Sequence, residues 1–131
     1  MQTDPLADFL TQIRNASSAS KFEFLTTYSR VKSDVANVLK KEGYIGDCEL
    51  TKNGVHQGLK LTLKGETAGI KPIRGIRRVS KPGLRRYVGA GEIPKVLGGL
   101  GTAVLSTPKG ILSGHEAKKQ NVGGELLLYI W

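Results

Sequence analysis

The sequence predicts an α+β protein made of two small layers, an amino-terminal α-β-α-β-β half and a β-rich carboxyl-terminal half with short helices. Two early segments repeat apolar residues at helical spacing, whereas later segments are short β-branched runs separated by Gly and Pro. Residues 123–131 are almost continuously apolar, which is typical of a strand buried on both faces. Residues 65–69 look like a boundary, so we expect domains at 1–66 and 67–131.

The first helix is predicted to begin with Asp4 as its cap and Pro5 at its first position, where the missing N–H costs nothing. The serine-rich residues 17–20 end the pattern, and Arg14 and Asn15 near that end are expected to face outward. The inner stripe is expected to comprise Leu6, Phe9, Leu10, Ile13 and Ala16.

A strand at residues 22–28 and a second helix follow, the helix capped by Ser29 or Ser33 and ended by Gly43. Its inner stripe is predicted to be Val31, Val35, Val38 and Leu39, with Lys32, Lys40 and Lys41 toward water. Residues 44–51 and 57–64 read as a hairpin, because Asn53-Gly54 between them readily adopts the positive φ of a tight turn.

The second half is predicted to consist of short strands and turns. Pro82 and Gly83 fit the central positions of a type II turn between a strand at 73–79 and a partner strand at 84–88. The remaining expectations are a short helical turn within 89–100, strands at 101–105 and 111–113, an exposed short helix at 114–121 and the apolar strand at 123–131.

The net charge of +9 is unevenly distributed along the chain. Residues 1–66 hold nine Lys/Arg against eight Asp/Glu, whereas residues 67–131 hold eleven against three. An unbalanced run of cations usually has a polyanionic partner, and here we favour nucleic acid over a membrane surface or an acidic protein. Lys81, Arg85 and Arg86 are expected to contact phosphates, and Lys32 is added from the first half.

A hydroxyl-rich turn, residues 106–110, follows the predicted strand at 101–105. Ser106 and Thr107 can donate and accept hydrogen bonds, Lys109 supplies a point charge suited to phosphate, and Gly110 allows close approach. An ordinary surface turn has the same composition, so this stretch alone does not decide between structure and function.

Catalytic, metal-binding and cofactor-binding patterns are not evident in the sequence. His115-Glu116 lacks the second histidine of a zinc-binding helix, and the Gly98–Gly101 cluster precedes a strand, whereas phosphate-binding loops follow one. The single cysteine, Cys48, excludes an internal disulfide and suits a reducing compartment. We therefore expect no enzyme activity, metal, cofactor, small-molecule substrate or membrane span, and a cytoplasmic location.

Several motifs, in order and spacing, resemble the bacterial-type small-subunit (30S) ribosomal protein eight family, and the resemblance covers essentially the whole chain. They are DPLADFLTQIRNA (4–16), KEGY (41–44), IRRVSKPGLR (76–85), VLGGLG (96–101), STPKG (106–110) and GGELLLYIW (123–131). Pro108 departs from the usual second serine of the STSKG loop and removes one hydroxyl and one N–H donor.

The resemblance implies a protein that binds directly to an irregular stem in the central domain of the small-subunit (16S-type) rRNA and helps assemble the platform. It implies that Ser106, Thr107 and Pro108 enter the RNA minor groove, with Tyr87, Lys109, Gly110 and Glu125 around them. Arg14 and Asn15 would form a second contact. Neighbouring small-subunit proteins and the chain's own operon mRNA, through translational autoregulation, are the other implied partners.

RNA chemistry agrees with this implication. Double-stranded RNA exposes its 2′-hydroxyls in a shallow minor groove, where small hydroxyl side chains can reach them. Two alternatives stay open: a general duplex- or DNA-compacting protein with the same charge, and an enzyme acting on RNA, which would need a general base or a metal.

Overall fold

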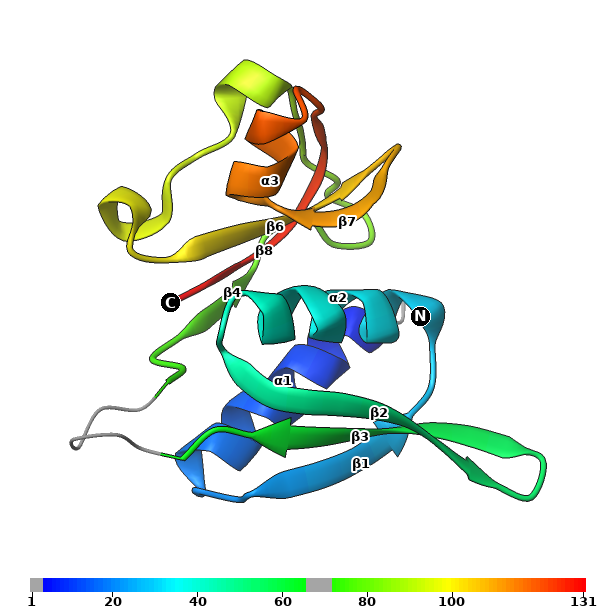
Figure 1. Ribbon diagram of the computed structural model, residues 1–131. Helices are drawn as coiled ribbons and strands as arrows, with labels where there is room; N and C mark the ends of the chain where they lie inside the picture. Colours follow the sequence, from blue (N-terminus) through cyan, green and yellow to red (C-terminus); the bar gives the residue numbers. More distant parts are fainter. Residues whose placement is uncertain (1–3, 66–71) are drawn as a thin grey trace.

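The computed structural model describes residues 4–65 and 72–131, which form two antiparallel sheets with helices packed on them (Figure 1). The elements are α1 (Pro5–Ser18), β1 (Glu23–Thr27), α2 (Arg30–Lys41), β2 (Ile45–Asn53), β3 (His56–Leu63), β4 (Ile76–Arg78), β5 (Tyr87–Val88), β6 (Thr102–Thr107), β7 (Gly110–Ser113), α3 (Gly114–Lys119) and β8 (Gly124–Ile130). Short 3-10 turns lie at Ala90–Glu92 and Val96–Gly99. The α+β class is confirmed. Most of the expected domain boundary lies outside the described residues, so the division into two domains stays a prediction.

Helix α1 begins as its sequence predicts. The Asp4 carboxylate accepts a hydrogen bond from the Ala7 N–H at 3.2 Å, and Pro5 occupies the first helical position. The five residues of the predicted inner stripe are all buried, and Arg14 and Asn15 on the opposite side are exposed. The helix therefore packs its apolar side on the first sheet (Figure 1).

Helix α2 is capped by Ser29, whose side chain accepts a hydrogen bond from the Lys32 N–H at 3.1 Å. Its predicted inner face was partly wrong, since Val31 is 47% exposed whereas Lys32 is only 7% exposed. The buried face is one residue further along and follows the i, i+3, i+4, i+7 spacing: Lys32, Val35, Ala36 and Leu39.

The Lys32 side chain is buried because its polar end has partners within the first half. Its ammonium donates to the Thr27 hydroxyl at 3.0 Å and to the Thr27 carbonyl at 3.4 Å. The same nitrogen lies 5.9 Å from the centroid of the Phe9 ring, so the ammonium joins α2 to β1 and α1. The expectation that Lys32 faces water is therefore wrong.

The first sheet has the strand order β1-β3-β2, and α1 and α2 cover one of its faces (Figure 1). The β2–β3 hairpin is confirmed, with Asn53 opposite His56 and with Gly54 and Val55 at its tip. Gly54 has φ of +66°, and Gly43, with φ of +87°, follows the end of α2 as predicted.

The second sheet has the order β4-β8-β6-β7, and β5 also pairs with β8. The carboxyl-terminal stretch is confirmed as a central strand, since Leu126, Leu127 and Leu128 are all buried. The turn at Pro82-Gly83 is also present, with φ of +86° at Gly83. However, residues 84–88 do not form the predicted partner of β4. Only Tyr87–Val88 is a strand, and it pairs with Gly124 and Glu125 of β8, because β4 occupies residues 128–130 of the same edge and β6 occupies the other edge.

One hydrophobic core joins the two halves, because α1 and α2 lie between the two sheets (Figure 1). Val35 and Leu39 of the first half share this core with Leu128 and Ile130 of β8. Polar contacts also cross between the halves: an Arg14 guanidinium nitrogen donates to the Ile76 carbonyl at 2.6 Å. On the other face of the second sheet, α3 contributes the fully buried Ala117, so this helix is exposed on one side only.

Candidate nucleic-acid interface

The β6–β7 hairpin contains the predicted hydroxyl-rich residues. Ser106 and Thr107 are the last residues of β6, so the strand extends two residues beyond the prediction. Pro108 and Lys109 form the tight turn, in which Pro108 is the first central residue and its fixed φ is favourable. Gly110 has φ of +106°, which a residue with a side chain rarely adopts. Pro108 therefore suits this turn and stiffens it.

The two hydroxyl groups have different roles. The Thr107 hydroxyl donates to the Gly110 carbonyl at 2.7 Å and accepts from the Lys109 N–H at 3.1 Å, so its proton is used within the turn. The Ser106 hydroxyl has no hydrogen-bond partner in residues 4–65 and 72–131. Ser106 can therefore both donate to and accept from a ligand, whereas Thr107 holds the turn.

Strand register places three of the predicted residues in one row. Glu125 of β8 lies opposite Tyr87 of β5 on one side and opposite Ser106 of β6 on the other. Residues directly opposite each other in a sheet project to the same face with Cβ atoms about 5 Å apart. Tyr87, which is 69% exposed, Glu125 and Ser106 thus form one surface, although they are far apart in the sequence.

The Glu125 carboxylate is held by two donors. Its Oε2 atom accepts hydrogen bonds from the Ser80 hydroxyl at 2.5 Å and from Arg85 Nη1 at 2.8 Å. Burial alone would raise the pKa of Glu125, but the bonds from Ser80 and Arg85 outweigh it and the pKa lies below its ordinary value. The carboxylate is therefore ionised near neutral pH, and it fixes the Arg85 guanidinium next to Ser106.

Ser80 is a site residue that the sequence reasoning missed. It is fully buried, and its hydroxyl oxygen also accepts from the Arg86 N–H at 3.2 Å. A serine directly before the Lys81-Pro82-Gly83 turn was the available signal, because short hydroxyl side chains often bond to nearby backbone in turns. Ser80 thus links Glu125 to the backbone that carries Arg85 and Arg86.

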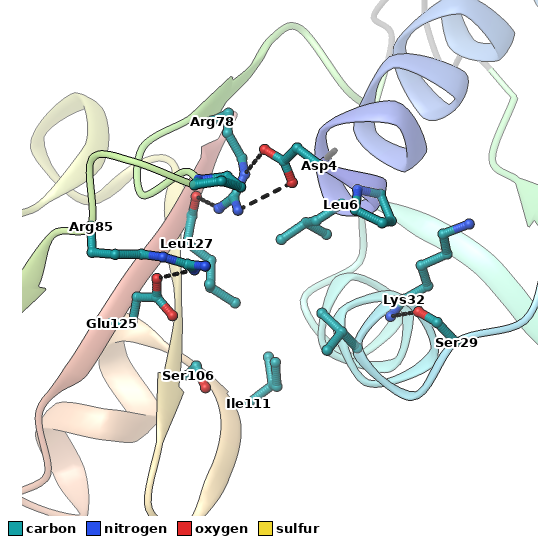
Figure 2. A pocket seen from close by; sticks show the side chains of 13 residues that line it. Asp4, Leu6, Ser29, Lys32, Arg78, Arg85, Ser106, Ile111, Glu125 and Leu127 are labelled. Carbon is teal, nitrogen blue, oxygen red and sulfur yellow. Dashed lines mark hydrogen bonds and ion pairs between the residues drawn. The ribbon is translucent and has the colours of Figure 1, made fainter. Parts of the chain in front are cut away.

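A hollow of about 330 Å³ lies beside this row, between the two halves (Figure 2). Its apolar wall includes Leu6, Ile111 and Leu127, and Ser106 and Arg85 lie at its border. Arg78 closes one side: its Nε lies 3.2 Å from the Asp4 carboxylate and its Nη1 donates to the Leu127 carbonyl at 2.8 Å. The same carboxylate therefore caps α1 and joins it to the second sheet.

Three predicted cations of the second half have no internal partners. Lys81, Arg86 and Lys109 are exposed, and their side chains make no hydrogen bond or ion pair with the residues that the structure describes. An unpaired, exposed cation can bind a phosphate without first breaking a protein contact.

The remaining predicted residues lie elsewhere. Arg14 and Asn15 are about 15 Å along α1 from its start at the hollow, because each helical residue adds about 1.5 Å. Lys32 lines the hollow, yet its ammonium is bonded to Thr27. The structure therefore gathers ten of the predicted residues at or around the hairpin and leaves Arg14, Asn15 and the Lys32 ammonium apart from them.

No group of three or more metal-ligating side chains occurs among the described residues. His115, one of the possible metal ligands, contacts the Glu42 carboxylate, with 3.3 Å between Nε2 and Oε1. Burial raises the pKa of the Cys48 thiol. In the same part of the chain, no helix is long and apolar enough to cross a bilayer.

The fold and the hairpin surface together define a basic α+β protein whose free cations and free hydroxyl suit a polyanionic ligand. The chain matches, over residues 4–131, the family described as ribosomal protein S8. It is 49% identical to the small ribosomal subunit protein uS8 of Lactobacillus delbrueckii subsp. bulgaricus, over 98% of each chain. It is 52% identical to uS8 of Persephonella marina, over 100% of each chain.

The chain belongs to the ribosomal protein S8 family. It is therefore a structural ribosomal protein and not an enzyme. The family predicted from the sequence motifs is confirmed.

Proposed function

We propose that this chain is a cytoplasmic component of the small ribosomal subunit that binds directly to a stem in the central domain of the small-subunit rRNA and helps assemble the platform. The names of its relatives support a place in that subunit. The observation that carries the RNA contact is the row Tyr87–Glu125–Ser106 beside a rigid turn, with the Ser106 hydroxyl free.

The row suits the minor groove of duplex RNA. That groove is wide and shallow and exposes 2′-hydroxyls, to which the Ser106 hydroxyl can donate or from which it can accept. Thr107 and Pro108 make the hairpin rigid, so it loses little conformational entropy when it binds RNA. Glu125 holds Arg85 in place, and Lys81, Arg86 and Lys109 would contact phosphates on either side.

Arg14 and Asn15 form a separate proposed contact at the other end of α1. One guanidinium nitrogen of Arg14 already donates to the Ile76 carbonyl, which fixes the side chain and leaves its other donors for RNA. Lys32 would act indirectly by supporting the wall of the hollow. The chain's own mRNA, if it carries a stem of the same shape, would occupy the same hairpin surface, and neighbouring small-subunit proteins remain proposed partners.

The hairpin proposal is tested with Ser106→Ala. The exchange removes one hydrogen bond, typically about 1–1.5 kcal/mol, so we expect roughly tenfold weaker binding to the central-domain stem in a filter-binding assay. Binding to a generic RNA duplex of equal length should change less than twofold. Thr107→Val, which weakens the turn, should also act mainly on the stem.

Ser33→Ala in α2 is the matched control, and it should bind both RNAs like the native chain. If Ser106→Ala weakened binding to the stem and to the generic duplex equally, the hairpin would not be a specific reader. If the native chain bound RNA and DNA duplexes alike, a general compacting protein would be the better description.

A further inference from the structure

A second hollow, of about 260 Å³, lies at the opposite end of β6 from the hairpin. Residues 93–101 and the start of β6 form two of its sides, and α3 forms another. Its apolar surface is made of Ile93, Pro94, Val96 and Ala103, and its basic side chains are Lys95, His115 and Lys118. An apolar hollow with a few charged groups at its border is the usual composition of a small ligand site.

The two lysines at this hollow lack acidic partners. No Asp or Glu lines it, and the ammonium groups of Lys95 and Lys118 have no partner within residues 4–65 and 72–131. The hollow between α2 and β7 differs, because there Arg30 faces Asp34 and Lys41 faces Glu116. The hollow beside α3 therefore has the electrostatics of an anion site.

His115, the third basic side chain at this hollow, has protein partners. Its Nε2 lies 3.3 Å from the Glu42 carboxylate of α2, and its Nδ1 lies 3.4 Å from the Ser113 hydroxyl. These contacts hold the imidazole at the border of the hollow as part of its wall. Lys95 and Lys118 are thus the groups left to bind an anion.

The backbone fixes the loop that carries Lys95. Leu97, Gly98 and Gly99 have φ values of +50°, +65° and +102°, and this left-handed run bends the loop beside the start of β6. Leu97 is unusual in this region because the Cβ atom of an L residue disfavours it, and such backbone is retained where its geometry matters. Gly101 permits the close contact, since a Cβ atom there would lie 2.6 Å from Val96 Cγ1.

We propose that this hollow is a second RNA contact, which takes one unpaired nucleotide with its base against Ile93 and Pro94 and its phosphates at Lys95 and Lys118. The inference rests on the proposed RNA-binding function but concerns a different part of the RNA. The six residues of β6 separate the hollow from the hairpin turn by about 17 Å, so a nucleotide here lies outside the part of the stem that Ser106 touches.

The test compares Lys95→Gln/Lys118→Gln with Lys21→Gln/Lys119→Gln. Both variants lose the same charge, and Lys118 and Lys119 are neighbours in the last turn of α3, so the effect on the helix end is matched. Only the first variant changes residues that line the hollow. Each is titrated, at several salt concentrations, against the isolated stem and against the complete central domain of the rRNA.

We expect Lys95→Gln/Lys118→Gln to bind the isolated stem within about twofold of the native chain and the complete central domain on the order of tenfold more weakly. Its salt slope on the complete domain should fall by about two, one for each lost phosphate contact. Ultraviolet cross-linking of the native complex should attach a base to the peptide that contains residues 93–96. The control variant should behave like the native chain.

Equal behaviour of the two variants on the complete domain, or a base cross-link confined to other peptides, would overturn the second contact. Loss of native binding to the isolated stem would instead overturn the proposed function itself. The two failures are therefore distinguishable in one set of titrations.

Discussion

The two halves of the chain differ in how many of their cationic side chains have a protein partner. In the first half many cations have partners: ion pairs join Arg30 to Asp34, Lys40 to Asp47, Lys41 to Glu116 and Lys60 to Glu23. In the second half Arg78 and Arg85 are paired, whereas the following side chains have no partner among the described residues: Arg77, Lys81, Arg86, Lys95, Lys109 and Lys118.

For the binding of a phosphate, the number of cations in each half therefore matters less than whether those cations already have a protein partner. Lys32 and Lys81 are both lysines close to turns, yet Lys32 is buried and bonded to Thr27 while Lys81 is exposed and unpaired. A buried, bonded ammonium must lose its partners before it can contact a phosphate, and that loss offsets the gain. The second half therefore supplies most of the available charge, since Lys21, Lys52 and Lys64 are the exposed cations of the first half without a partner among the described residues.

The largest expected effect tests this comparison directly. Lys81→Gln/Arg86→Gln/Lys109→Gln should weaken binding to the central-domain stem on the order of 100-fold and lower its salt slope by about three, because each side chain would neutralise one phosphate. Lys40→Gln/Lys41→Gln/Lys60→Gln removes the same charge from cations of the first half that already have an acidic partner, and it should change binding only a few-fold. Filter binding between 50 and 200 mM salt, a range in which such slopes are large, measures both. Equal losses would mean that only net charge matters.

A smaller effect is expected at Glu125, whose carboxylate holds the paired Arg85 guanidinium of the second half. Glu125→Gln replaces two charge-assisted hydrogen bonds by weaker ones and should lower the free energy of unfolding by about 1–2 kcal/mol at pH 7. Glu92→Gln, at an exposed acid of the same half, is the control and should be neutral.

The pH dependence of stability gives Glu125 a second readout. Because the pKa of Glu125 is lowered in the folded chain, its contribution is full above the unfolded value of about 4.3 and is lost as the pH falls through the folded value. Urea unfolding between pH 5 and pH 3 should therefore show a flatter loss of stability for Glu125→Gln than for the native chain. Parallel curves would show that the carboxylate adds nothing beyond packing.

The smallest effect is expected at Arg30. Its Nε lies 3.9 Å from the Asp34 carboxylate, and its side chain is 90% exposed. Exposed pairs of this kind contribute little to stability, so Arg30→Gln should leave both urea unfolding and RNA affinity unchanged within error. A loss of RNA affinity as large as that of a single Lys81→Gln exchange would contradict the contrast between the halves.

Local signals predicted most of the fold. Asp4-Pro5, Gly43 and Pro82-Gly83 act on the backbone of their immediate neighbours, so their effects can be inferred from a short stretch of sequence. Residues 84–88 were misassigned because strand pairing depends on which edge is nearest in space, and β8 lies about 40 residues further along the chain.

The sequence located the candidate site but did not show which role each of its residues has. The stretch 106–110 was identified from its hydroxyls and its resemblance to a family motif, and the structure shows it as a hairpin tip. That Thr107 is bonded within the turn while Ser106 is free depends on register, which composition does not encode. Ser80 was missed because its partner Glu125 is 45 residues away in the sequence.

The row across β5, β8 and β6 has a consequence for the order of events during synthesis. Tyr87 and Ser106 are added to the growing chain before Glu125, and β8 is the strand on which both of the others align. A nascent chain that ends before residue 124 lacks that template, so it carries the cations without the surface that positions them. The proposed selective recognition of an RNA would thus begin only once β8 has been made and has paired with β5 and β6.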